Sequence, residues 1–206
     1  NLASVVKERS AVAIGLESAN DEILRKCIRK GFTVGDYEQA ARVLNKLNIP
    51  LRTYLLLKPP YLTERAAIED AKASVKYAAQ FSESVSVNPV NVQRSTLVES
   101  LWSRGSYAPP MIWSLIEVLK DGSGKEGCRL LSSPSGGGAA RGVHNCGKCD
   151  KALLSAVEKF SYSQDPAEFE KVDCECRGEW QALLELQDLM FTSVDVKKHV
   201  SENIVE

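Results

Sequence analysis

The chain has 206 residues, which is enough for one large domain or for a domain with a small appendage. Its 44% apolar and 26% charged residues are typical of a soluble globular protein, and no apolar run approaches the ~20 residues of a membrane span. The formal net charge of −1 argues against a generally basic nucleic-acid-binding domain. The start at Asn1 has neither an initiator Met nor the features of a signal peptide. We therefore expect a cytoplasmic protein and interpret the chain as part of a longer one.

The first hundred residues alternate between short apolar runs and amphipathic segments. Each apolar run has the composition of a buried parallel strand, and each amphipathic segment repeats apolar residues at helical spacing. This alternation predicts βαβ units, in which right-handed crossovers place the helices outside a parallel sheet. Three strands cannot close an eight-stranded barrel, so a half-barrel and a small open α/β domain both fit. The predicted strands are 11–16, 51–57 and 84–90, and the predicted helices are 21–30, 33–44, 63–79, 97–102 and 112–119.

The composition changes after about residue 120. A turn-rich break is followed by a Ser- and Gly-rich segment at 132–142, whose stretch Ser133–Gly138 lacks the Gly-Lys-Ser/Thr ending of a phosphate-binding loop and favours a mobile loop. We predict residues 1–120 to be an α/β domain and residues 121–206 to be a mostly helical appendage that contains cysteines. Its predicted helices are about 150–160, 166–171 and 178–190, and its last stretch, 191–206, docks or frays.

Polar side chains follow each predicted strand. Because parallel strands end at the same edge of a sheet, and α/β folds bind ligands at that edge, we expect these side chains to form one binding site. Some have a simpler explanation, with Asn20 as a helix cap, Lys58 as a solvated residue and Asn91 as a turn former. The candidates are Glu17, Ser18 and Asn20 after the first strand, Lys58 after the second, and Asn88, Asn91 and Gln93 after the third.

Four of the six cysteines lie in two close pairs late in the chain. Without a secretory signal, such pairs favour a metal site over a disulfide framework. Two pairs can supply the four thiolates of a structural, tetrahedral zinc ion, and His144 is an alternative ligand. Reduced cysteines packed in a small core, or two disulfides, are the other interpretations. The four residues are Cys146, Cys149, Cys174 and Cys176.

Two groups of motifs resemble the radical S-adenosylmethionine (SAM) superfamily. The segment 12–24, with its Gly-x-Glu-Ser strand end, and the following Lys30-Gly31 are similar to the fourth strand and next helix of radical SAM barrels. The similarity is to the branch that contains the elongator catalytic subunit and the methylthiotransferases. Leu57-Lys58-Pro59-Pro60 stands where many members have Gly-x-Pro-x-Glu-Thr. Together with segments 88–93, 101–110 and 144–150, this departure resembles the archaeal radical SAM proteins of archaeosine biosynthesis, over most of residues 11–180.

The resemblance implies a partial parallel (β/α) barrel whose strands correspond to about the fourth through sixth of a radical SAM barrel. It implies a four-iron four-sulfur cluster and SAM, which generate a 5′-deoxyadenosyl radical. That radical acts on a lysine attached to 7-deazaguanine in tRNA, and carbon–nitrogen cleavage then leaves archaeosine. The resemblance also implies a protein partner, the transglycosylase-like archaeosine synthase that attaches the lysine.

Site roles are also implied by the resemblance, position by position. Glu17 and Ser18 would approach the amino or ribose groups of SAM. Lys58 would face a carboxylate of SAM or of the substrate, or a phosphate. Asn88, Asn91 and Gln93 would meet adenine, ribose or the modified base.

The chain departs from the superfamily in its cysteines. It has no Cys-x3-Cys-x2-Cys, and Cys146-x-x-Cys149 lies far beyond the predicted strands. Because thiolates must hold the iron of such a cluster, we expect this stretch alone to be inactive. Two alternatives stay open: another radical SAM tRNA-modifying enzyme, such as a methylthiotransferase or an elongator-like enzyme, and a non-enzymatic RNA- or protein-interaction domain.

Overall fold

The computed structural model describes residues 11–124 and 126–190, so the predicted docking or fraying of 191–206 falls outside the described residues. The strands are β1 (Val12–Glu17), β2 (Leu51–Leu57), β3 (Ser84–Pro89) and β4 (Arg129–Leu131). The helices are α2 (Asp21–Ile23), the π-helix η1 (Leu24–Ile28), α3 (Val34–Lys46), α4 (Glu64–Ala78), α5 (Leu97–Ser103), α6 (Ile112–Gly122), α7 (Asp150–Ser163), the 3-10 helix η2 (Pro166–Lys171) and α8 (Cys176–Met190).

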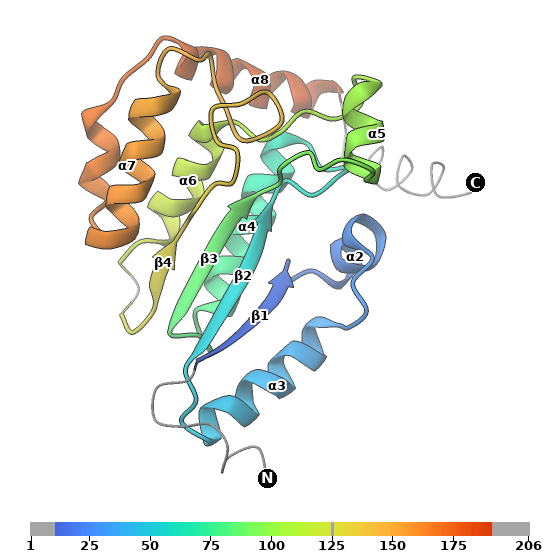
Figure 1. The fold of residues 1–206 in the computed structure, drawn as a ribbon, viewed down its shortest axis with the longest axis vertical. Helices are drawn as coiled ribbons and strands as arrows, with labels where there is room; N and C mark the ends of the chain where they lie inside the picture. Colours follow the sequence, from blue (N-terminus) through green and yellow to red (C-terminus); the bar gives the residue numbers. More distant parts are fainter. Residues whose placement is uncertain (1–10, 125, 191–206) are drawn as a thin grey trace.

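The four strands form one parallel sheet in the order β1-β2-β3-β4. This confirms the α/β class. The strand order follows the chain and never reverses, which is the winding of a barrel sector and differs from doubly wound sheets. Figure 1 shows α4 and α6 behind the sheet, with α7 beside β4. The described sheet is open, so closure into a barrel stays a prediction.

The short strand β4 was missing from the sequence prediction. It pairs with β3 in parallel register, with Val85 beside Leu130. β4 has only three residues, between a turn and the Ser- and Gly-rich segment. Three residues are too few to show a periodic pattern in the sequence. The sheet therefore extends into residues 121–206, which were expected to be mostly helical.

Local signals explain where the helices begin. Asn20 Oδ1 accepts hydrogen bonds from the N–H groups of Glu22 and Ile23, at 2.9 and 3.4 Å, and so caps α2. Thr33 and Asp36 form a capping box at the start of α3. The predicted helix 21–30 ends at Arg29 in a left-handed conformation, φ 58°, two residues before the expected stop at a glycine. Among the described residues, no helix combines the length and apolar character that crossing a membrane requires.

β2 is buried mainly on one face, whereas β3 is buried on both faces. In β2, Leu51, Leu55 and Leu57 are buried in the core against the helices, whereas Arg52 is exposed and Tyr54 is half-buried. The pleat sends successive side chains to opposite faces, so this alternation defines a second, more polar face. Strands buried on both faces were expected. β3 meets this expectation, because Ser84 and Ser86 are buried as well as Val85 and Val87, whereas β2 is fully buried on the helix side only.

Candidate functional site

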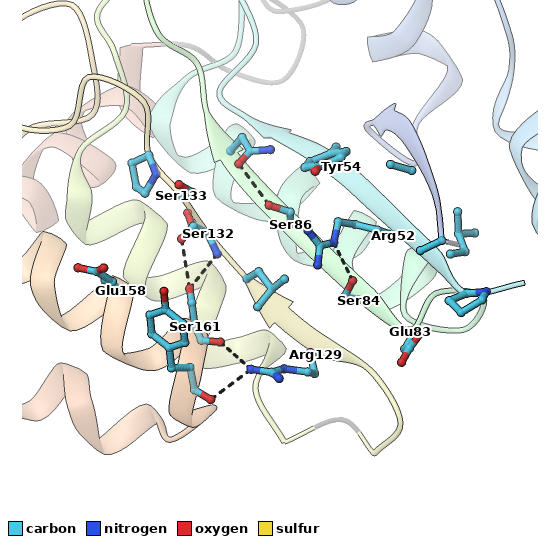
Figure 2. A pocket seen from close by; sticks show the side chains of 18 of the residues that line it. Arg52, Tyr54, Glu83, Ser84, Ser86, Arg129, Ser132, Ser133, Glu158 and Ser161 are labelled. Carbon is cyan, nitrogen blue, oxygen red and sulfur yellow. Dashed lines mark hydrogen bonds between the residues drawn. The ribbon is translucent and has the colours of Figure 1, made fainter. Parts of the chain in front are cut away.

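The second face of the sheet borders a hollow of about 1240 Å³ (Figure 2). Alternate residues of β2 and β3 bring Arg52, Tyr54, Ser86 and Asn88 to its wall. Ser86 Oγ donates a hydrogen bond to Asn88 Oδ1 at 3.3 Å. Of the seven residues predicted to form a binding site, Asn88 is the one that lines this hollow.

Two arginines in this hollow were missed as candidate residues. The parallel register places Arg52 beside Ser84 and Ser84 beside Arg129, so the three residues form one row across the sheet. Arg52 Nε donates to Ser84 Oγ at 3.1 Å, and Arg129 Nη2 donates to the carbonyl groups of Ser161 and Tyr162 at the end of α7. Both contacts are visible in Figure 2. The signal that could have revealed this face was Arg52 and Tyr54 at alternate positions of an otherwise leucine-rich strand.

The candidates after β1 lie toward α4 and the neighbouring loop. Glu17 has φ 70°, and its Oε1 accepts a hydrogen bond from Lys30 Nζ at 3.0 Å. Ser18 is fully buried, and its Oγ donates to Asp70 Oδ1 of α4 at 2.7 Å. Asn20 is exposed and caps α2, which is the simpler of its two interpretations. The neighbouring hollow, of about 610 Å³, is lined by Asn20, Asp70 and mostly small residues of α4.

Asp70 gives a pH-dependent prediction. Burial raises its pKa from 3.8 to about 6, while the hydrogen bond from Ser18 opposes the rise, and its Oδ2 has no partner among the described residues. A raised carboxyl pKa means that the folded state binds the proton more tightly than the unfolded state. Asp70 therefore contributes most stability below pH 4 and loses it as the pH rises toward 6. We expect Asp70→Asn to remove this fall in the free energy of unfolding between pH 4 and pH 6. The substitution should raise the free energy of unfolding at pH 7 by about 1–2 kcal/mol. Urea unfolding of both proteins from pH 4 to pH 7 measures the difference, and parallel curves would contradict it.

Lys58 is buried in an ion pair and is not a solvated residue. Its Nζ donates to Glu64 Oε2 at 2.6 Å, and the two side chains are 7% and 1% exposed. The ammonium also lies 5.7 Å from the ring centre of Tyr107, whose hydroxyl donates to the Lys58 carbonyl at 2.8 Å. Glu64 is therefore the acceptor that determines where the Lys58 ammonium sits at the end of β2.

Of the candidates after β3, Asn91 lies under the Ser- and Gly-rich loop. A Cβ added to Gly136 would lie 3.0 Å from Asn91 Nδ2, so the loop backbone packs directly on that side chain. The N–H of Val92 donates to the Arg141 carbonyl at 2.7 Å, which holds the far side of the loop. Gln93 is exposed, and its carbonyl accepts a hydrogen bond from Thr96 Oγ1.

The seven candidates do not meet at one place. Glu17 bonds to Lys30, and Asn20 and Gln93 are exposed. Ser18 and Lys58 contact residues of α4, Asn88 lines the open hollow, and Asn91 lies beneath the loop. Ser18 lies two residues after the buried Leu16, on the helix side of the sheet. Lys58 would follow Arg52 and Tyr54 to the hollow by strand alternation, but its left-handed backbone, φ 62°, turns it toward Glu64 instead. Whether a ligand bridges these places stays a prediction.

The Ser- and Gly-rich loop is packed, although the composition favoured a mobile loop. Gly138 N–H donates to the Val143 carbonyl at 2.8 Å, and a Cβ on Gly142 would lie 2.1 Å from the Gly136 carbonyl oxygen. We expect Gly142→Ala to lower the free energy of unfolding by about 2 kcal/mol, because this contact is with backbone and cannot rotate away. Gly178→Ala is the matched control, since nothing lies within 4 Å of its added Cβ and α8 gains a better helix former. Thermal unfolding of both variants tests the difference, and equal melting temperatures would contradict it.

The four cysteines converge on one point. Their sulfur atoms all lie within 4.8 Å of one another. The Sγ atoms of the neighbouring pairs are 3.7 Å apart for Cys146–Cys149 and Cys146–Cys174, and 3.5 Å apart for Cys149–Cys176. Four thiolates around one ion at ~2.3 Å give tetrahedral edges of ~3.8 Å, so the geometry fits a single metal ion. All four are free thiols, which removes the two-disulfide interpretation for this structure.

The surroundings of the cysteines also suit a metal site. Backbone N–H groups of Cys149 and Lys148 lower the pKa of Cys146 to about 7, which favours the thiolate that metals bind. Burial raises the pKa of Cys149 and Cys176, a cost that a bound cation would offset. Gly147 adopts φ 82° in the turn between the first pair, where a side chain would be strained. His144 does not join the group, and its Nδ1 lies 2.8 Å from the Gly142 carbonyl oxygen.

No protein-family model matches the chain. Individual curated proteins and a solved structure do match it. The chain is 40% identical over 190 residues to archaeosine synthase subunit beta of Methanosarcina acetivorans, covering 91% of the chain and 55% of that protein. It is 41% identical over 187 residues to the protein of the same name in Thermococcus kodakarensis, covering 89% and 58%. The chain thus spans about half the length of the curated relatives it matches.

A solved structure gives a more distant match. The archaeal Methanocaldococcus infernus Elp3 with an N-terminal deletion is 25% identical, with a TM-score of 0.50, over 59% of this chain and 29% of that one. An uncharacterized protein of Methanocaldococcus jannaschii is 34% identical over 182 residues. These similarities support a fold and a family related to the radical SAM proteins named by the sequence resemblance.

Proposed function

We propose that the longer protein containing this sequence acts in tRNA modification, as the radical SAM lyase that converts a lysine-bearing 7-deazaguanine to archaeosine. The similarity to two proteins named archaeosine synthase subunit beta, over about nine tenths of this chain, carries the proposal. The Elp3 match, over 59% of this chain, also supports it, because the sequence motifs resemble the branch that contains the elongator catalytic subunit. A tRNA substrate would place the protein in the cytoplasm.

The chain's own residues fit part of the cofactor set. SAM and an iron–sulfur cluster would supply the radical. The residues described here offer carboxylate, amide and ammonium groups near the strand ends, in Glu17, Asn88, Asn91 and Lys58. They offer no thiolate there, and the four clustered cysteines are spaced for one ion, whereas a four-iron cluster holds each thiolate on a separate iron. The cluster would therefore be bound by sequence outside this chain.

Two partners follow from the proposal, tRNA as the substrate and a companion protein. The relatives are named as a subunit beta, and we propose the transglycosylase-like archaeosine synthase as the companion protein.

We further propose that residues 1–120, extended by β4, supply part of a radical SAM barrel and that the remaining helices form an appendage held by the cysteines.

Deleting the gene in its source organism tests the proposed reaction. Mass spectrometry of nucleosides from total tRNA should show loss of archaeosine and accumulation of the lysine-bearing 7-deazaguanine precursor. Complementation with the intact gene should restore archaeosine. Unchanged archaeosine together with loss of a different tRNA nucleoside would instead support a methylthiotransferase or elongator-like activity. Unchanged tRNA would support a non-enzymatic interaction domain.

We also propose that the cysteine group, Cys146, Cys149, Cys174 and Cys176, holds one structural zinc ion. The sulfur spacing supports a single tetrahedral metal ion. With four thiolate ligands, the ion would have no coordination position left for a substrate, as in structural zinc sites. Elemental analysis of chain purified without chelators should find about one zinc per chain and substoichiometric iron. Stoichiometric iron with the colour of an iron–sulfur centre would contradict the assignment.

A further inference from the structure

The first turn of α6 lies between the cysteine group and the Lys58–Glu64 ion pair. A helix start needs acceptors for its free N–H groups, and Met111, at the cap position, provides none from its side chain. Two side chains from elsewhere do this instead. Met111 N–H donates to Glu64 Oε1 at 2.8 Å, and Ile112 N–H donates to Asn145 Oδ1 at 2.8 Å. The same helix turn is thus bonded to both groups.

Asn145 connects this turn to the cysteines. While its Oδ1 accepts from α6, its Nδ2 lies 3.7 Å from Cys149 Sγ as a donor. Its backbone N–H donates to the buried carboxylate of Asp150, at 3.2 and 3.1 Å to the two oxygens. Trp113 of α6 makes a second connection, with its Nε1 donating to Cys176 Sγ at 3.3 Å. Donors of this kind orient metal ligands and stabilise their charge.

Glu64 connects the turn to Lys58. Its Oε1 accepts from Met111 N–H and from Ser114 Oγ, the latter at 2.5 Å, and its Oε2 accepts from Lys58 Nζ. Ser114 Oγ accepts in turn from Trp180 Nε1 of α8 at 2.8 Å. Glu64 is 1% exposed, so each of its contacts is shielded from water and constrains the others.

We propose that Asn145 is a positioning residue, through which the cysteine group holds the first turn of α6, and with it Glu64 and the Lys58 ammonium at the end of β2. This inference rests on the proposed function in two respects, the zinc ion at the cysteines and the place of Lys58 at the substrate site. It assigns to the metal site a role beyond stapling α7 to α8. In this proposal the metal-bound loop determines the position of the Lys58 ammonium at the end of β2.

Three variants of the whole chain separate this role from general stability. Asn145→Ala removes both side-chain bonds, whereas Asn145→Asp keeps the acceptor for Ile112 and loses the donor to Cys149. Gln164→Ala is the matched control, because Gln164 makes equivalent amide bonds to Leu130, at 2.8 and 3.0 Å, at the opposite end of α7. The readouts are Met111 amide exchange by NMR, the rate of reductive methylation of Lys58 by peptide mass spectrometry, and the zinc dissociation constant.

In zinc-saturated protein, Asn145→Ala should accelerate both Met111 exchange and Lys58 methylation at least tenfold and weaken zinc about 10–100-fold. Asn145→Asp should weaken zinc similarly yet keep Met111 exchange within about threefold of the parent, because the cap on α6 survives. Gln164→Ala should change none of the three readouts. Unchanged Met111 and Lys58 rates in Asn145→Ala, or equal increases in Gln164→Ala, would overturn the proposal.

Chelation distinguishes this inference from the zinc proposal. Removing zinc from the parent should raise the Met111 and Lys58 rates to those of Asn145→Ala. If zinc leaves and both rates stay unchanged, the coupling is wrong and the zinc assignment stands. If the chain binds no zinc, the zinc assignment fails, and the comparison of Asn145→Ala with Gln164→Ala still decides whether Asn145 positions Glu64 and Lys58.

Discussion

Cys149→Ser is expected to abolish zinc binding and to lower the free energy of unfolding by more than about 3 kcal/mol. Cys149 is buried, its sulfur is within 3.7 Å of Cys146 and 3.5 Å of Cys176, and a serine hydroxyl cannot replace a thiolate on zinc. The loss is large because the metal ties the loop before α7 to the start of α8, two segments with few other connections to each other. Zinc analysis and guanidinium unfolding measure the two effects.

Cys128→Ala is the matched control for that experiment. It also removes one thiol, but Cys128 lies just before β4 and is not among the four clustered cysteines. Zinc content should remain about one per chain. If Cys149→Ser kept full zinc, the ion would be bound without Cys149 and the four-cysteine site would be wrong. If the parent bound no zinc and both variants lost stability equally, the four thiols would be ordinary reduced cysteines in a small core.

Lys58→Met is expected to lower the free energy of unfolding by about 3–5 kcal/mol. It leaves Glu64 buried, with Met111 N–H and Ser114 Oγ as its remaining partners, and an unpaired buried carboxylate is costly. Urea unfolding at pH 7 measures the loss. A loss below about 1 kcal/mol would mean that the ion pair is solvated and that Lys58 is held by something else.

Restoring neutrality should recover most of that stability. In Lys58→Met with Glu64→Gln, no buried charge remains, and the glutamine carbonyl can still accept from Ser114 or Met111. This double variant gives a folded protein without the ammonium. In the longer protein it should abolish turnover while leaving cluster content intact, if Lys58 serves the substrate site. Normal turnover would remove Lys58 from that site.

Local patterns were sufficient for most of the secondary structure. The apolar runs at 51–57 and 84–89 are strands, and Thr33, Thr63 and the prolines before 112 mark helix starts close to where they were expected. The close spacing of the cysteine pairs was sufficient to predict a shared site, because a short turn keeps two thiols within reach of one ion. These features depend on neighbours along the chain.

Contacts between distant segments required the tertiary structure. Strand-end spacing suggested that seven side chains converge, but Ser18 bonds to Asp70 of α4, 52 residues away along the chain. The left-handed backbone at Lys58 turns its side chain to Glu64, at the start of the same helix. The three-residue strand β4 is defined by its pairing with β3 and not by its own pattern. Arg52 and Arg129 became neighbours of one serine only through register.

The two cysteine pairs show the same division. Their residue types and spacing already indicated metal chemistry, since thiolate ligands are read directly from the sequence. The link from Cys149 through Asn145 and α6 to Glu64 and Lys58 had no signal in the sequence. Ligand identity is a property of single residues and their near neighbours. Which buried donors and acceptors share one desolvated network depends on how helices from 64, 112 and 176 onward pack together, and that arrangement exists only in the folded chain.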